Sequence, residues 1–175
     1  IAAKFNHDYG VDFFPITEPV IEGAAPRVMN LRDGTKKMSK SDPSDMTRIN
    51  MTDDADTIAK KIKKAKTDPE PLPETAQGLE TRPEAKNLVG LYAALTGTSV
   101  EAVLAEFGGE GFGAFKPKLA EAAVSYIAPI SEEYARLIGD KAEIDAILKR
   151  GAERAREAAV PVVAEIRDRV GYWRP

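Results

Sequence analysis

The chain has 175 residues, of which 43% are hydrophobic and 30% charged, a balance typical of a soluble globular protein with one real core. It has no cysteine and one histidine, which excludes disulfides and thiolate or histidine-rich zinc sites and agrees with a cytoplasmic location. The formal net charge of -3 argues against nonspecific binding of nucleic acid, and no segment approaches the roughly 20 apolar residues that cross a bilayer, so we expect local RNA contacts at most and no membrane role.

The first third of the chain is predicted to be mostly extended. The first residue is Ile1, and apolar residues recur at helical spacing up to Gly10, so we expect the end of a helix cut from a longer protein. Residues 11–31 contain three prolines and end in an apolar run, which predicts a brief strand. Residues 32–43 include the turn dipeptide Asp33-Gly34 and lack periodicity, which predicts a loop.

The first clear helix is predicted to follow Thr52, which can cap it. Acidic residues in its first turn and lysines at its end complement the helix dipole. The five lysines are Lys60, Lys61, Lys63, Lys64 and Lys66. They can contact RNA phosphates, but we interpret them as the solvated face of the helix. Residues 67–84 contain four prolines and are predicted to be a linker between domains.

Beyond residue 84 every segment has helical periodicity. Thr98 with Glu101, and Asp140 with Glu143, each predict a capping box at the start of a helix. Two prolines inside the later helical patterns predict bends. The predicted fold class is mainly α, a helical bundle preceded by a short segment with extended elements and a loop.

Residues 36–42 carry the most distinctive chemistry of the chain. Lys37 and Lys40 lie three apart, with Ser39 and Ser41 beside them, and offer cations and hydroxyls at a spacing suited to a polyphosphate. When a carboxylate attacks the α-phosphate of ATP, a positioned ammonium stabilises the charge on the departing pyrophosphate. Charge pattern alone favours a solvated surface loop, since most lysine-rich stretches are solvated.

The string Lys37-Met38-Ser39-Lys40-Ser41 resembles the signature loop of class I aminoacyl-tRNA synthetases. Other segments narrow the resemblance to the bacterial tryptophanyl-tRNA synthetases, and together they extend over nearly the whole chain. They are Arg27-Val28-Met29, Thr35 to Pro43, Lys61-Ile62-Lys63 with Thr67-Asp68, Gly111 to Lys116, and Gly151 to Ala155.

The resemblance implies roles for six residues. Lys37 and Lys40 are expected to be catalytic and to neutralise the ATP phosphates, while Met38, Ser39 and Ser41 complete the loop over the nucleotide. Val28 is expected to pack against adenine, although a valine next to a strand is more often simple core. Mg²⁺ is expected to arrive with ATP, and the carboxylates of the chain show no metal-site spacing of their own.

The resemblance also implies a domain plan. Residues 1–51 are expected to be the C-terminal remnant of the catalytic domain, 52–66 a connecting helix, 67–84 a linker, and 85–175 a helical domain that meets the anticodon arm of tRNA(Trp). The Rossmann-like half, with its histidine motif and tryptophan pocket, is expected to be missing, because the chain has one histidine and no glycine-rich strand-to-helix turn.

The whole enzyme is expected to form tryptophanyl-adenylate from tryptophan and ATP and to transfer the tryptophan to tRNA(Trp), as a homodimer. This chain alone is expected to be inactive. Two alternatives stay open: a tyrosyl-type class I synthetase, against which the loop and the helical segments argue, and a non-catalytic helical module that binds RNA or another partner. The C-terminal Tyr172-Trp173-Arg174 is interpreted as packing back onto the helices, not as a nucleotide site.

Overall fold

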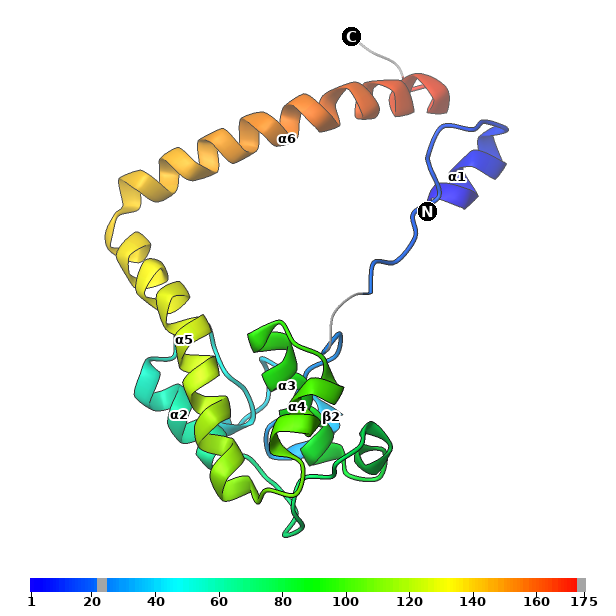
Figure 1. Cartoon of the computed structure of the whole chain (residues 1–175). Helices are drawn as coiled ribbons and strands as arrows, with labels where there is room; N and C mark the ends of the chain where they lie inside the picture. The colour runs from blue at the N-terminus through cyan, green and yellow to red at the C-terminus, as the bar shows by residue number, and fades with distance from the viewer. Residues whose placement is uncertain (22–24, 173–175) are drawn as a thin grey trace. The chain divides into compact units, whose positions relative to one another are not determined.

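The computed structural model describes residues 1–21 and 25–172, so Trp173 and Arg174 lie outside the described residues. The chain forms two compact units (Figure 1). The first, which we call the central unit, comprises Ile21–Arg136. The second, the terminal unit, comprises Ile1–Val20 together with the chain from Leu137 onward.

A two-stranded antiparallel hairpin opens the central unit. Strand β1 (Met29–Asn30) pairs with β2 (Asp33–Lys37) around a tight turn. The strand predicted at the end of 11–31 is confirmed, but the prediction of a loop over all of 32–43 is wrong for β2. Glycine and lysine have low strand propensity, so β2 depends on pairing and packing that the local sequence does not reveal.

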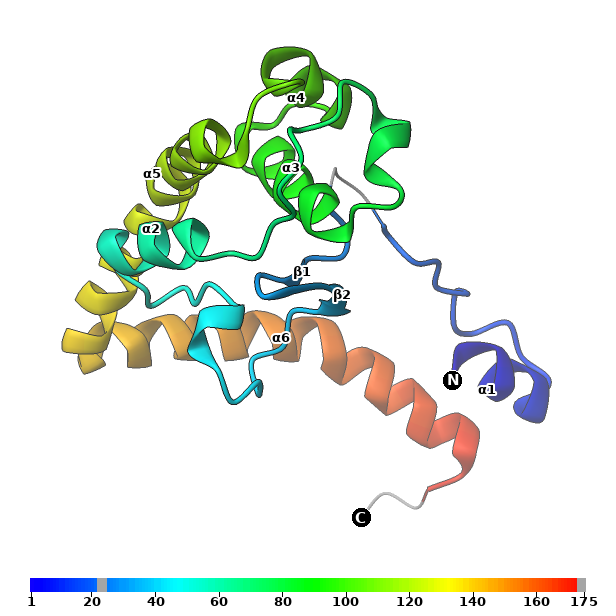
Figure 2. The same ribbon diagram turned by 90° about the horizontal axis from the view of Figure 1, so that it is seen from below.

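Four helices build the core of the central unit next to this hairpin (Figure 2): α2 (Ala55–Lys63), α3 (Pro83–Thr96), α4 (Val100–Phe107) and the first half of α5 (Phe112–Gly139). The largest fully buried apolar side chains are Phe115, Leu31, Ile58, Ile62, Leu72, Leu88, Leu104, Leu119, Val89 and Val103. The fold is mainly helical, as predicted.

Leu31, in the turn of the hairpin, joins three segments through its own main chain. Its N–H donates to the carbonyl of Thr47 at 2.9 Å, and its carbonyl accepts from the N–H of Lys66 at 2.7 Å. Its side chain is 1% exposed. The hairpin, the chain after residue 44 and the end of the α2 region are therefore held together at one residue.

The proline-rich segment 67–84 is packed and is not a linker. Leu72 and Leu79 are each 2% exposed, and the main chain of Leu72 exchanges two 2.8 Å hydrogen bonds with Gly109 and Glu110. A short 3-10 helix, η2, covers Ala76–Leu79. The compact units divide elsewhere in the chain.

The helix starts differ by a residue or two from two of the predictions. Asp54, and not Thr52, caps α2, and Ser99, and not Thr98, caps α4. Thr98 is already used to end α3, because its N–H donates to Ala93 at 3.0 Å beyond the left-handed Gly97. The predicted cap at Asp140 is confirmed, since its carboxylate accepts from the N–H of Glu143 at 3.0 Å.

The terminal unit contains α1 (Ala2–Tyr9) and α6 (Lys141–Val170). Asn6 folds the chain after α1 by accepting from the N–H of Phe14 at 3.0 Å, and the guanidinium of Arg169 lies 4.8 Å from the ring of Phe13. Neither helix has a buried residue among those described. The described part of the predicted bundle over 85–175 is mostly helical, and the core of the central unit also uses α2, which lies before that range.

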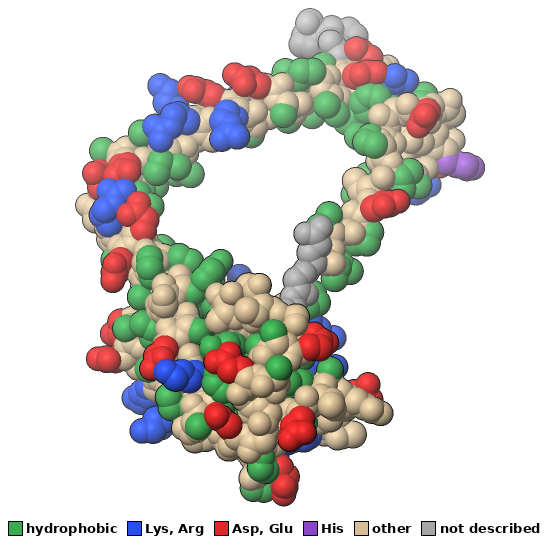
Figure 3. Space-filling model, viewed as in Figure 1, with side chains coloured by type: hydrophobic (Ala, Val, Ile, Leu, Met, Phe, Trp, Pro, Cys, Tyr) green, Lys and Arg blue, Asp and Glu red, His purple; other side chains and the backbone are tan. Residues whose placement is uncertain are grey.

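Charges of both signs are interspersed over the visible face (Figure 3). Among the described residues no single helix is long and apolar enough to span a membrane, and α3 with α4 reaches that length only as a pair bent by 108°.

Candidate functional site

Three of the six predicted site residues meet at the open end of the hairpin. The N–H of Met38 donates to the carbonyl of Val28 at 3.1 Å, which extends the pairing of β1 and β2 by one step. Val28, Lys37 and Met38 then line one open depression together with Pro26 and Arg27. Val28 and Met38 are only partly buried, so each keeps apolar surface available to a ligand.

The other three predicted residues form an exposed turn beyond the depression. The hydroxyls of Ser39 and Ser41 lie 3.1 Å apart, and the N–H of Asp42 donates to the carbonyl of Ser39 at 3.3 Å. Lys37 and Lys40 are exposed, and within the described part of the chain neither ammonium forms an ion pair. Both cations are therefore free to meet an anionic ligand.

Lys36, the next lysine in the loop region, has a different environment. Its ammonium lies 3.0 Å from the carboxylate of Asp33, which also accepts from the hydroxyl of Thr35 at 2.6 Å. The hydrogen bonds from Thr35 and Lys36 lower the pKa of Asp33 to about 2. The pair ties β2 internally, whereas Lys37 and Lys40 form no ion pair with the described residues.

Helix α3 fixes the strand that leads into the site. The side-chain amide of Asn87 accepts from the N–H of Met29 at 3.0 Å and donates to its carbonyl at 3.1 Å, as a neighbouring strand would. A Cβ on Gly34 would lie 2.6 Å from the backbone of Pro83 and Glu84, so only glycine allows the hairpin to approach α3 this closely.

The chain that leaves the site is held by polar groups around Asp42. The side-chain amide of Asn30 donates to the Asp42 carboxylate at 3.3 Å, and the Arg48 guanidinium donates to the Asp42 carbonyl at 3.0 Å. The same carboxylate accepts from the N–H of Ser44 at 2.9 Å. Both ends of the turn 38–42 are thus anchored, while its middle is exposed.

One residue of this region was misjudged from the sequence. Lys61 was interpreted as part of a solvated lysine face, but it is 1% exposed, with its ammonium 2.6 Å from both Asp45 and Asp53. The pattern Ile58, Lys61, Ile62, Ala65 has the spacing of a buried helical face and was the available signal. The other four lysines are exposed, as expected.

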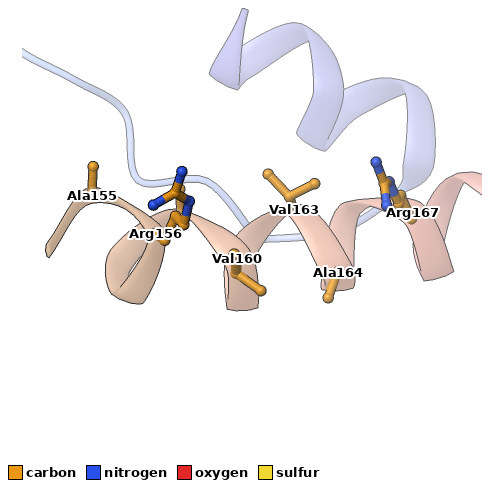
Figure 4. A pocket seen from close by; sticks show the side chains of 7 residues that line it. Ala155, Arg156, Val160, Val163, Ala164 and Arg167 are labelled. Atoms are coloured by element: carbon orange, nitrogen blue, oxygen red, sulfur yellow. The ribbon is translucent and has the colours of Figure 1, made fainter. Parts of the chain in front are cut away.

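A separate hollow on the terminal unit contains none of the predicted residues. Figure 4 shows it along α6, where Val160 and Val163 lie between the guanidiniums of Arg156 and Arg167. Within the described residues there is also no group of three or more histidine, aspartate or glutamate side chains able to hold a metal ion. The predicted site residues all lie at the hairpin and its turn.

The hairpin and its exposed loop lysines lie within the part of the chain that matches a known family. Residues 1–127 match the family described as tRNA synthetases class I (W and Y), and the chain belongs to this family.

Two relatives within that family are tryptophan–tRNA ligases. Tryptophan–tRNA ligase of Caulobacter vibrioides is 60% identical over 174 residues, which cover 99% of this chain and 51% of the relative. Tryptophan–tRNA ligase of Rhizobium meliloti is 59% identical over 191 residues, covering 98% of this chain and 54% of the relative. The resemblance to tryptophanyl-tRNA synthetases is confirmed, and the chain spans about half the length of the curated relatives it matches.

A solved structure agrees at the level of the fold. The tryptophanyl-tRNA synthetase of Mycoplasma pneumoniae superimposes with a TM-score of 0.84 at 23% identity, covering 98% of this chain and 51% of that one. At this identity the likeness shows the fold alone. It covers nearly every residue of this chain.

Proposed function

We propose that this chain is the C-terminal portion of a tryptophan–tRNA ligase and that it supplies the loop that stabilises the phosphates of ATP. The observation that carries the proposal is the pair of exposed ammoniums, Lys37 at the end of β2 and Lys40 on the turn 38–42, which is anchored at both ends. The family and the relatives support the reaction class. The whole enzyme would form tryptophanyl-adenylate and transfer tryptophan to tRNA(Trp).

In the proposed reaction a carboxylate oxygen of tryptophan attacks the α-phosphorus of ATP. A new oxygen–phosphorus bond forms as the bond to the β-phosphate bridging oxygen breaks, and both electrons of that bond leave with pyrophosphate. Lys37 and Lys40 would neutralise the charge that grows on this leaving group, an interaction stronger in the transition state than in the ground state. The hydroxyls of Ser39 and Ser41 would donate to phosphate oxygens.

The depression beside the turn would accept the adenine. Val28 and Met38 present apolar surface there, which suits the flat faces of a base, and Lys37 lies at the same rim. Mg²⁺ would enter with ATP, with phosphate oxygens and water as ligands. The tryptophan pocket is assigned to the half of the relatives' length that this chain does not span.

The remaining parts of the proposal concern the whole protein. The helical region 85–175 would meet the anticodon arm of tRNA(Trp), and the complete enzyme would work as a homodimer in the cytoplasm. The chain alone would not activate tryptophan, because it would lack the amino-acid pocket. The lengths of the relatives support this division, since this chain accounts for about half of each.

Tryptophan-dependent exchange between ATP and pyrophosphate, measured on the full-length protein, tests the proposal, with tyrosine as the control substrate. We expect exchange with tryptophan only. We expect Lys40→Ala to lower the rate of adenylate formation by on the order of tenfold or more, with little change in tryptophan binding.

The matched control is Lys36→Ala, because Lys36 is also exposed but is already paired with Asp33. It should leave adenylate formation within about twofold of the wild type if the unpaired cations are the ones that act. Equal losses of adenylate formation and tryptophan binding in Lys40→Ala would contradict a transition-state role. Absence of exchange with either amino acid, from a folded full-length protein, would overturn the proposed function.

A further inference from the structure

Beneath the loop, α2 carries a lysine that is almost completely removed from solvent. The side chain of Lys61 is 1% exposed, and its ammonium lies 2.6 Å from an oxygen of Asp45 and 2.6 Å from an oxygen of Asp53. Asp53 is itself 8% exposed, whereas the Asp45 side chain is 56% exposed. One cation thus joins a buried carboxylate to a carboxylate at the surface.

The two carboxylates belong to the segment that follows the loop. Asp45 begins the 3-10 helix η1 (Asp45–Thr47), and Asp53 precedes α2. Asn50 braces them, because its side-chain amide donates to Asp45 at 2.9 Å and to Asp53 at 3.2 Å. Its main-chain N–H also donates to Asp53 at 2.9 Å. Lys61 therefore fixes a closed set of polar groups that folds residues 45–53 against α2.

From this set one residue reaches the loop itself. The guanidinium of Arg48 lies 3.1 Å from the Asp45 carboxylate, and it donates to the carbonyl of Asp42 at 3.0 Å and to that of Ser44 at 3.3 Å. Asp42 is the first residue after the Lys-Met-Ser-Lys-Ser string. A continuous polar path thus runs from Lys61 through Asp45 and Arg48 to the end of the loop.

We propose that Lys61 is a positioning residue for the ATP loop, and that it acts by fixing Arg48, which holds the C-terminal end of the turn that carries Lys40. This inference rests on the proposed function and deepens it. Lys61 lies on the buried side of α2 and does not touch the loop, so its effect must pass through Asp45 and Arg48.

A contribution to folding alone does not account for this arrangement. A buried ion pair adds little net stability compared with apolar side chains of similar volume, because the desolvation of both ions offsets their attraction. Lys61 lies between Ile58 and Ile62 on the core face of α2, where an apolar residue would serve packing equally well. What the ion pairs add is a fixed geometry, and small displacements of a charge-stabilising group cost large factors in rate.

The test is Lys61→Met in the full-length protein, assayed by tryptophan-dependent exchange between ATP and pyrophosphate. Methionine keeps the apolar stem and removes the charge. We expect at least a tenfold loss in kcat/KM for ATP with the KM for tryptophan within twofold. Lys63→Met, an exposed lysine on the same helix, is the matched control and should stay within twofold of the wild type.

A second comparison separates positioning from general damage. In a Lys40→Ala background the loop has lost the cation that Lys61 is proposed to place, so Lys61→Met should there lower kcat/KM by less than threefold. The proposal is overturned if the decreases in kcat/KM caused by Lys40→Ala and Lys61→Met multiply in the double variant. It is also overturned if Lys61→Met has the same kcat/KM as the Lys63→Met control. If Lys61→Met fails to fold, Asp45→Asn replaces it as the test. It should also lower kcat/KM for ATP, by a smaller factor, and lose most of this effect in the Lys40→Ala background.

Failure of the inference and failure of the proposed function are distinguishable. If Lys40→Ala itself leaves exchange unchanged, the role of the loop is wrong and the inference falls with it. If Lys40→Ala loses activity while Lys61→Met and Asp45→Asn both behave like the surface control, the loop acts on ATP but Lys61 does not position it.

Discussion

Replacing Asn87 by leucine tests whether α3 holds the strand that enters the ATP loop. Asn87 is 9% exposed, and its side chain makes two hydrogen bonds with the main chain of Met29, at 3.0 and 3.1 Å. Leucine has a similar volume and can make neither bond. At roughly 0.5–1.5 kcal/mol for each net hydrogen bond, the loss is about 1–3 kcal/mol.

Both hydrogen bonds of Asn87 go to β1, so losing their free energy should make local opening of the hairpin easier. A change of about 1–3 kcal/mol corresponds to exchange that is faster by roughly 5- to 150-fold. Hydrogen exchange of the Met29 and Met38 amides in the full-length protein measures it, since the Met38 amide closes the hairpin onto Val28.

Lys86→Leu is the control for this experiment, because Lys86 is an exposed neighbour on the same helix. It should leave both amides protected as in the wild type. The reasoning is refuted if Asn87→Leu leaves exchange unchanged, or if both substitutions accelerate it equally. A third result, faster exchange over the whole central unit, would mean that Asn87 supports the core and not the hairpin in particular.

Three further predictions concern stability. Gly34→Ala should cost about 1–3 kcal/mol and lower Tm in calorimetry, because its Cβ would lie 2.6 Å from the backbone of α3, whereas Gly113→Ala, with open space around the new Cβ, should not destabilise. The pKa of Asp33 is held at about 2, below its ordinary 3.8, so its contribution to stability is complete above that ordinary value and is lost as pH falls toward 2. The difference in unfolding free energy between wild type and Asp33→Asn should therefore shrink between pH 4 and pH 2, and a difference that grows there would contradict the assignment. Lys61→Met should lower the unfolding free energy by about 3 kcal/mol in urea titration, the lower end of the range for a broken buried pair, since one of its two carboxylates is half exposed. Lys63→Met should change it by less than about 0.5 kcal/mol.

The sequence was most informative where local chemistry decides the structure. The glycine that ends α1 and the aspartate that caps α6 were found from residue type and spacing, because a left-handed Gly10 and a short carboxylate at Asp140 act within one turn. The loop Lys37-Met38-Ser39-Lys40-Ser41 was recognised from its string alone. Its roles remain proposals, since they depend on a ligand and on residues outside this chain.

The predictions that failed depend on contacts between distant segments. Strand β2 exists because it pairs with β1 and lies on α3, and the pairs Met29 with Asn87 and Gly34 with Pro83 are far apart in sequence. The proline-rich segment 67–84 looked like a linker because prolines are common in linkers, but its leucines at 72 and 79 fill the core. Composition does not show which apolar side chains of an irregular segment are buried.

The prediction that Lys61 is solvated was wrong for a related reason. A run of five lysines is usually solvated, and a lysine enters a core only where carboxylates meet it. Those carboxylates, Asp45 and Asp53, lie 16 and 8 positions earlier by residue number and come from different segments. Only the apolar spacing around Lys61 hinted at its position.

The main-chain bonds of Leu31 hold the hairpin that carries the proposed ATP loop. Its N–H and carbonyl are committed to Thr47 and Lys66, and the turn itself is fixed at Met38 and at Asp42. Only Ser39, Lys40 and Ser41 lie between these two fixed points. We therefore expect that the long side chains of Lys37 and Lys40 rotate to follow successive phosphate geometries while the ends of the turn stay in place.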